Sequence, residues 1–220
     1  MAEALIFDED GVLIDTEPIS MKATKRAIQE VYGYDVDPLV FHEFQGEGIA
    51  EYLAGGLAKY GVHLDDLSQL IARRTQIMEE LMREGGLHLF PGVVSLLHKV
   101  KYSALKMGIA TSSRREKLVE ACKDAALDLS IFDAVLTGDD VARHKPDPEI
   151  YEQAAKGLDV SASHCLVIED SVLGVQAAKS AGMLCVAVLN SFPERELAAA
   201  GADMIIESLE TLSIEDIRLL

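Results

Sequence analysis

The sequence of 220 residues has no long apolar run, few basic residues and few cysteines. Its apolar runs fall well short of the ~20 residues that a helix needs to cross a bilayer, so we expect no membrane-spanning segment and no membrane partner. No basic segment followed by a long apolar region lies near Met1, which argues against a secretory signal peptide. These absences favour a cytoplasmic protein.

Basic residues are outnumbered, with 20 Lys and Arg against 37 Asp and Glu and a formal net charge of −17. This charge disfavours non-specific binding to nucleic acid or to an anionic surface, so we expect no nucleic-acid partner. An anionic substrate is still compatible with it, because a metal ion and one well-placed lysine reverse the sign of the field locally.

The three cysteines, Cys122, Cys165 and Cys185, are odd in number and widely spaced. We expect them to be buried free thiols in a reducing compartment. The sequence has no Cys-x-x-Cys, and His164 next to Cys165 is not a usual pair of ligands, so a structural zinc site is not expected.

Hydrophobic residues make up 49% of the chain, which is enough for a packed core and argues against disorder. The first short apolar run, residues 4–7, is typical of a buried parallel strand. From Pro91 onward apolar strands alternate with amphipathic helices, which predicts an α/β fold with a parallel sheet. The expected strands in this part are 104–110, 132–136, 165–168, 184–189 and 204–206.

Residues 19–89 show helical patterns at 19–32, 49–60 and 67–84 and contain no convincing strand. They lie between the first strand and the alternating part of the chain. We therefore expect a Rossmann-like, three-layer core formed by residues 1–16 and 91–220, with residues 17–90 inserted as an all-helical cap.

Two aspartates, Asp8 and Asp10, directly follow the first strand. In an open α/β sheet, ligands bind beyond the carboxyl ends of the strands. One carboxylate could attack an electrophile and the other could exchange protons with the leaving group, while a magnesium ion holds both. Taken alone, a strand followed by an Asp-Gly turn explains this stretch at least as well.

Three further segments favour the functional interpretation: Thr111-Ser112-Ser113, Lys145, and the pair Glu169-Asp170. Each lies at or beyond the end of an expected strand, and parallel strands bring their carboxyl ends to one edge. Each segment alone has an ordinary explanation as a helix cap or a surface turn. Two acidic pairs facing each other across one edge are harder to explain without a cation.

A phosphate ester placed at this edge would be attacked by Asp8, giving an aspartyl-phosphate, with Asp10 as the proton donor and acceptor. The carboxylates of Asp8 and Asp170 and the backbone carbonyl of Asp10 would hold the metal, with Glu169 as a ligand or support. Lys145, the Thr111 hydroxyl and the backbone near Ser112 would bind the phosphoryl oxygens.

Four motifs, FDEDGVLIDTEP, IATSS, HKPDPEIY and VIEDSVLGVQAAKSAG, resemble in order those of the haloacid dehalogenase-like hydrolase superfamily. The chain is most similar to the β-phosphoglucomutase-like phosphatases, whose helical cap follows the first motif. The resemblance implies that Asp8 is the nucleophile, that Asp10 is the general acid and base, and that Thr111 and Lys145 bind phosphate. It also implies that Mg²⁺ is held by Asp8, Asp10 and Asp170 with Glu169 close by.

The chain departs from the family pattern at Glu9, which replaces a usually apolar residue. This side chain could point to solvent, alter metal binding or be an engineered change. In the cap, Ser20 stands where the mutases of the subgroup have a histidine. The first cap loop, FQGEGIAEY, has no basic residue where they carry an arginine. Arg73 or Arg74 could replace a cap lysine.

These departures favour a phosphatase over a mutase, because a mutase must bind a bisphosphate in two orientations. We expect a monomeric, magnesium-dependent phosphatase acting on a small phosphorylated metabolite, preferably a sugar phosphate. The alternatives are a β-phosphoglucomutase-like isomerase and a non-catalytic module that binds a phosphorylated ligand, which Glu9 keeps open. The cap loop residues Gln45, Gly46 and Glu47 are candidates for substrate selection, and a plain connecting loop is the competing interpretation.

Overall fold

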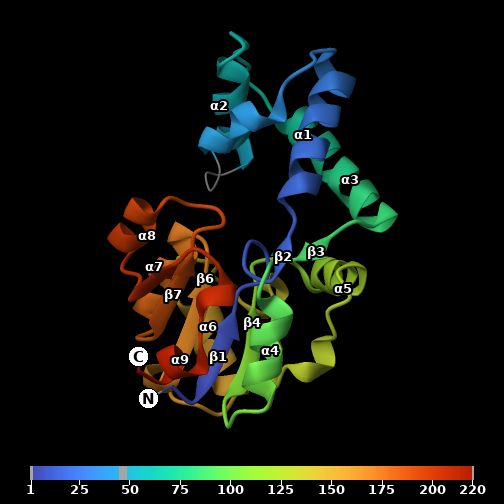
Figure 1. Ribbon diagram of the computed structural model, residues 1–220. Helices are drawn as coiled ribbons and strands as arrows, with labels where there is room; N and C mark the ends of the chain where they lie inside the picture. Colours follow the sequence, from blue (N-terminus) through green and yellow to red (C-terminus); the bar gives the residue numbers. More distant parts are fainter. Residues whose placement is uncertain (1, 45–48, 220) are drawn as a thin grey trace. The chain divides into compact units, whose positions relative to one another are not determined.

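The structure, a computed structural model, describes residues 2–44 and 49–219 and divides the chain into two compact units (Figure 1). The core unit comprises Met1–Asp15 and His88–Leu220, and the helical unit comprises Thr16–Leu87. The candidate cap loop at residues 45–47 lies outside the described residues.

A six-stranded parallel sheet forms the centre of the core unit, in the order β5-β4-β1-β6-β7-β8. This confirms the α/β fold with a parallel sheet. The strands are β1 (Ala4–Phe7), β4 (Lys106–Ala110), β5 (Ala134–Leu136), β6 (Cys165–Glu169), β7 (Leu184–Val188) and β8 (Met204–Ile206). The helices are α4 (Val93–Lys101), α5 (Arg115–Asp124), α6 (Glu149–Gly157), α7 (Val172–Ser180), α8 (Glu194–Ala200) and α9 (Ile214–Leu219).

Helices cover both faces of this sheet, as expected for a three-layer core. On one face, Ala4 and Ile6 of β1 pack in one cluster with buried residues of α6, α7 and α8. Successive side chains of a strand point to opposite faces, so Leu5 and Phe7 face the other layer. All four residues are fully buried, and Phe7 contacts Phe132 edge-to-face.

The register of the sheet aligns the strand ends that carry the candidate site. Phe7 pairs with Ile109 of β4 on one side and with Ile168 of β6 on the other. The next residues, Asp8, Ala110 and Glu169, therefore lie at the same level along the edge of the sheet.

Three parts of the core differ from expectation. A short antiparallel ribbon joins β2 (Ile14–Asp15) to β3 (His88–Leu89), so the expectation that residues 19–89 contain no strand was wrong. Two-residue strands are too short to show an alternating pattern. Glu169 is the last residue of β6 instead of the first residue beyond it, and the short helix α9 had no predicted counterpart.

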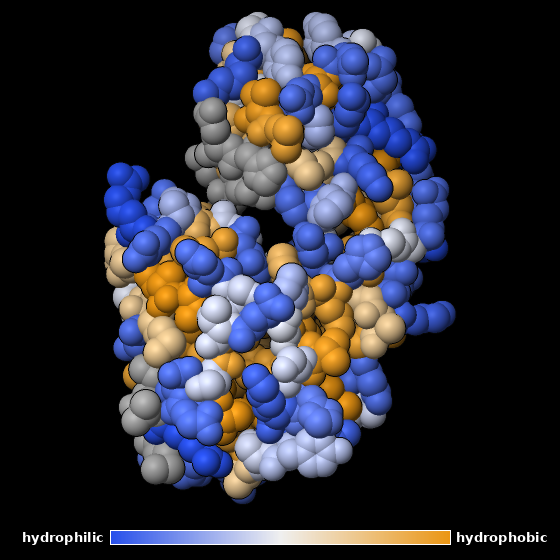
Figure 2. Space-filling model, viewed as in Figure 1, coloured by the Kyte–Doolittle hydropathy of each residue, from blue (hydrophilic) through white to orange (hydrophobic). Residues whose placement is uncertain are grey.

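The helical unit consists of α1 (Glu17–Tyr32), the 3₁₀ helix η1 (Pro38–Phe44), α2 (Ile49–Ala58) and α3 (Ser68–Glu84). A separate apolar cluster that includes Ile28, Phe41, Leu53 and Ile77 holds these helices together. The visible surface over α1 and α3 is mostly hydrophilic (Figure 2).

The three cysteines are free and buried, as expected. Burial raises the pKa of Cys122 to about 12 and that of Cys165 to about 11, so both thiols stay protonated at neutral pH. Among the described residues, no helix combines the length and the apolar character needed to cross a membrane.

Candidate active site

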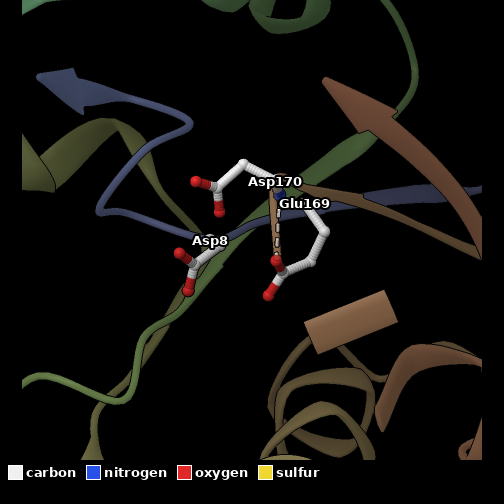
Figure 3. A group of neighbouring side chains, drawn as sticks. All are labelled: Asp8, Glu169 and Asp170. Carbon is white, nitrogen blue, oxygen red and sulfur yellow. Dashed lines mark hydrogen bonds between the residues drawn. The ribbon is translucent and has the colours of Figure 1, made fainter. Parts of the chain in front are cut away.

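Three buried carboxylates meet where β1 and β6 end: those of Asp8, Glu169 and Asp170 (Figure 3). One ligand oxygen from each lies within 4.8 Å of the others. Their convergence follows from the parallel pairing of β1 with β6, since both strands end at the same edge. A group of this kind, made only of hard oxygen ligands, suits a divalent cation such as Mg²⁺.

Lys145 brings a positive charge to the same place from the turn that precedes α6. Its Nζ donates hydrogen bonds to Asp8 Oδ1 at 2.6 Å and to Glu169 Oε1 at 2.7 Å. A third bond, to the carbonyl oxygen of Ala110, measures 3.2 Å. The ammonium is therefore held by groups that follow or end three neighbouring strands of the sheet.

Both carboxylate oxygens of Glu169 are engaged. Tyr151 of α6 donates its hydroxyl to Oε1 at 2.8 Å, beside Lys145. Oε2 accepts hydrogen bonds from the backbone N–H groups of Asp170 and Ser171 and from the Ser171 hydroxyl, each at 2.9 Å. A Cβ at Gly174 would overlap this carboxylate, so glycine there leaves the room that Glu169 needs.

Asp170 is positioned by the segment after β7 and by a glycine. The Ser191 hydroxyl donates to Asp170 Oδ2, and the Asn190 side chain donates to the carbonyl oxygen of Gly11 at 2.7 Å. Gly11 adopts a φ of 82°, and a Cβ there would collide with the Asp170 carboxylate. Only glycine meets both conditions without strain.

Burial and neighbouring carboxylates raise the pKa values of Asp8 and Asp170. Burial raises the pKa of Asp8 to about 7 against the opposing effect of Lys145, and Glu169 adds to the rise. Burial also raises the pKa of Asp170 well above its usual range, with Glu169 and Asp8 contributing. A bound cation would favour the ionised form of both. The residues therefore fit a magnesium ion.

The pKa values of Lys145 and Glu169 both shift in the direction that favours the charged form. Burial alone would lower the pKa of Lys145, but the carboxylates of Asp8 and Glu169 raise it above its usual value. Burial would raise the pKa of Glu169, but Lys145 and the surrounding donors lower it. Both groups are therefore charged at neutral pH.

Asp10 lies apart from the three clustered side chains. Its carboxylate is 42% exposed and forms a long ion pair of 3.7 Å with Lys117 of α5. The turn around it is tight, because the Glu9 carbonyl oxygen accepts backbone hydrogen bonds from Val12, Leu13 and Ile14. Its exposed position suits a group that exchanges protons with a substrate or water.

Thr111 is buried at the end of β4, and Ser112 is exposed on the same turn. The Thr111 hydroxyl donates to Glu9 Oε2 at 3.0 Å and accepts the Ser113 N–H at 3.0 Å. Glu9 is completely buried, so the suggestion that it points to solvent was wrong. Burial raises the pKa of its carboxyl, and Asp10 adds to that shift.

In the helical unit, the two arginines considered for the cap lie in different surroundings. Arg74 donates to the hydroxyls of Thr24 at 2.9 Å and Ser20 at 2.7 Å. Arg73 instead forms ion pairs with Glu30 and Glu80. Arg74 is therefore the one that lies next to Ser20.

Sequence reasoning did not identify Tyr151, Asn190 or Ser191. Asn190 and Ser191 follow β7, so the rule that ligands bind beyond strand ends could have drawn attention to them. Tyr151 lies inside a helix and gave no signal beyond its place in the motif HKPDPEIY.

A family model for haloacid dehalogenase-like hydrolases matches residues 5–188, and the chain belongs to this family. The chain is 37% identical over 216 residues to the chloroplastic protein SUPPRESSOR OF QUENCHING 1 of Arabidopsis thaliana; the match covers 97% of the chain and 20% of that protein. It is 33% identical over 219 residues to the phosphorylated carbohydrates phosphatase of Thermotoga maritima, covering 96% and 97% of the two chains. The crystal structure of β-phosphoglucomutase from Clostridium difficile superposes with a TM-score of 0.74 at 27% identity, covering 100% and 96%.

Membership of this family, together with similarity to a phosphatase and to a mutase, supports a phosphatase or a mutase activity. The fold and the recognised family agree with the resemblance of the four motifs.

Proposed function

We propose that the protein is a magnesium-dependent phosphatase that hydrolyses a small phosphorylated metabolite, preferably a sugar phosphate, through an aspartyl-phosphate on Asp8. The observation that carries the proposal is the position of Asp8, 2.6 Å from Lys145 and beside Asp170 at the open edge of the sheet. The likeness to the Thermotoga maritima phosphatase of phosphorylated carbohydrates supports the substrate class.

Asp8 is the nucleophile in this proposal. Its Oδ1 is held by Lys145, which leaves Oδ2 free of that contact for attack on phosphorus. The ammonium also reduces the repulsion between the attacking carboxylate and the anionic ester. The transition state of phosphoryl transfer spreads its charge over the equatorial oxygens, so such positioning contributes much of the rate.

The carboxylates of Asp8 and Asp170 and the backbone carbonyl of Asp10 would hold the magnesium ion. Glu169 supports them, because both of its oxygens are already engaged by Lys145, Tyr151 and backbone donors. When bound, the ion neutralises charge on the phosphoryl oxygens.

Asp10 transfers protons in this proposal. It protonates the departing oxygen of the substrate and then takes a proton from the water that hydrolyses the aspartyl-phosphate. Thr111 and the backbone around Ser112 bind phosphoryl oxygens. General acid–base catalysis of this type contributes about 10²- to 10⁴-fold, so Asp10→Asn is expected to lose that much in kcat.

A mutase is the second candidate, supported by the similarity to the Clostridium difficile β-phosphoglucomutase. The phosphatase is favoured because Ser20 replaces the histidine expected of a mutase, and its hydroxyl accepts a hydrogen bond from Arg74.

The test is phosphate release from a panel of sugar phosphates and small phosphoesters, with Mg²⁺ and with a chelator. A parallel arm follows glucose 6-phosphate formation from β-glucose 1-phosphate, in the presence of the sugar bisphosphate that a mutase requires. Asp8→Asn is compared with Asp35→Asn, which changes an exposed aspartate of the helical unit. Magnesium-dependent release that only Asp8→Asn abolishes supports the phosphatase. Isomerisation with little free phosphate makes the protein a mutase, and silence in both arms points to a non-catalytic module.

A further inference from the structure

Glu9 is a completely buried carboxyl between the candidate nucleophile Asp8 and the proton donor Asp10. Its Oε2 accepts the hydroxyl hydrogen of Thr111, whereas its Oε1 is buried without a hydrogen-bond partner among the described residues. Buried polar atoms are nearly always paired, so an unpaired carboxyl oxygen at this place calls for an explanation. Glu9 is not part of the carboxylate cluster of Asp8, Glu169 and Asp170, and the proposed proton transfer by Asp10 does not involve it.

The Thr111 hydroxyl has a single hydrogen to donate. In the structure that hydrogen points to Glu9 Oε2, and Oγ1 also accepts the N–H of Ser113. What Oγ1 can still offer to a ligand is a lone pair, which repels a phosphoryl oxygen. To donate to phosphate, the hydroxyl must turn away from Glu9 Oε2, and Glu9 then keeps its interaction with the Ser113 side chain.

We propose that Glu9 is a positioning residue that competes with bound phosphate for the hydrogen of the Thr111 hydroxyl and so weakens the affinity of the site for phosphate. The inference rests on the proposed function, because it takes Thr111 as a phosphate-binding group. It assigns a role to the residue that departs most from the family pattern. A phosphatase gains from such competition, because its product, inorganic phosphate, must leave before the next turnover.

The competition predicts different effects for two substitutions of Glu9. Glu9→Leu removes the competing acceptor and leaves the Thr111 hydroxyl to bind phosphate. Glu9→Gln removes the charge but keeps an oxygen that accepts the same hydrogen. If the hydrogen bond is what matters, the leucine variant binds phosphate more tightly and the glutamine variant stays close to the wild type.

The experiment measures the dissociation constant of inorganic phosphate by calorimetry, at one fixed pH and saturating Mg²⁺. The proteins are the wild type, Glu9→Leu, Glu9→Gln, Thr111→Val and the double variant Glu9→Leu/Thr111→Val. Glu9→Leu is expected to lower the constant about tenfold, which corresponds to about 1.4 kcal/mol. Glu9→Gln is expected to stay within about threefold of the wild type. In the Thr111→Val background, Glu9→Leu is expected to have no effect, because the shared hydrogen is gone.

Three results overturn the inference: an unchanged or weaker phosphate affinity in Glu9→Leu, an equal gain in Glu9→Gln, or an equal gain when Thr111 is already valine. The last two would mean that Glu9 acts by its charge and not through the hydroxyl. Melting curves of the ligand-free variants verify folding, and Glu9→Met replaces Glu9→Leu if leucine is not accommodated.

A second readout separates positioning from mere structural damage. KM of the best substrate is expected to fall in Glu9→Leu in parallel with the phosphate constant, which loss of packing would not produce. Failure of the proposed function shows itself differently, as a wild type that releases no phosphate from any ester. The binding cycle still decides the role of Glu9 in that case, since it requires no turnover.

Discussion

Lys145 and Glu169 form an ion pair inside the core unit, with Nζ 2.7 Å from Oε1 and side chains that are 7% and 0% exposed. Asp8 contacts the same ammonium at 2.6 Å, so Lys145 forms ion pairs with two buried carboxylates. With Asp170 nearby, three clustered carboxyl groups share the neighbourhood of this one ammonium. A group of carboxylates of this kind favours a divalent cation. A bound cation would in turn attract the anionic phosphate of an ester.

Removing the lysine should destabilise the fold as well as the activity. Lys145→Met leaves Asp8 and Glu169 as buried carboxylates without their partner, which typically costs about 3–5 kcal/mol. The loss should shrink as the pH falls, because the unpaired carboxylates then take up protons. Urea denaturation of the metal-free protein at pH 7 and pH 5 measures it. Lys156→Met, on the exposed side of α6, is the control. Equal stability of the two variants would contradict the ion pair.

The Tyr151 hydroxyl should stabilise the fold separately from the Tyr151 ring, whose centroid lies 4.9 Å from Lys145 Nζ. Tyr151→Phe keeps the ring but removes the donor to Glu169 Oε1, and hydrogen bonds to charged groups are worth about 1.5–3 kcal/mol. We expect a loss of that size in the free energy of unfolding and a lower kcat, because the Glu169 carboxylate that holds Lys145 is then less firmly fixed. Tyr102→Phe is the matched control, since Tyr102 is 76% exposed. A change no larger than that of the control would refute the role.

Magnesium binding should strengthen as the pH rises towards 7. The pKa of Asp8 is raised to about 7 and that of Asp170 is raised well above its usual range, so both carboxyls hold protons in the metal-free protein at mildly acidic pH. Binding must release these protons, which weakens the affinity for Mg²⁺ as the pH falls. Calorimetry in two buffers of different ionisation enthalpy counts the protons. Mg²⁺ binding to the Asp8→Asn variant should release fewer protons than binding to the wild type. Mg²⁺ binding to the wild type at pH 6 without proton release would contradict the expectation.

Ser191 should orient Asp170 for the metal. Its hydroxyl donates to Asp170 Oδ2, and loss of such a supporting bond typically costs about 10- to 100-fold in metal affinity. Ser191→Ala should therefore weaken Mg²⁺ binding in that range while the unfolding midpoint of the metal-free protein changes little. Ser180→Ala, at an exposed position of α7, serves for comparison. If both variants bind Mg²⁺ alike, Asp170 needs no such support.

The fold was largely predictable from the chain because its signals are local. An apolar run such as residues 4–7 and the alternation of strands and helices after Pro91 predict a parallel sheet. The carboxyl ends of its strands share one edge. That rule was enough to place Asp8 near Glu169 and Asp170 before any contact was known.

The partners of these residues were not predictable in the same way. Tyr151 reaches Glu169 across 18 positions and Ser191 reaches Asp170 across 21, and neither spacing has a local pattern. The two-residue strands β2 and β3 were missed for a related reason. Their pairing comes from positions more than seventy residues apart, and neither is long enough to alternate.

The sequence by itself determined the layered α/β core, the helical insertion and the types of side chain at the strand ends, because periodicity and composition reflect burial along each element. Only the tertiary structure decided which individual atoms of these side chains pair. It placed Lys145 between Asp8 and Glu169 and turned Glu9 inward to Thr111, 102 positions away in the chain. Hydrogen bonds and ion pairs act over a few ångströms in space, and the distance between residues along a chain does not determine that separation.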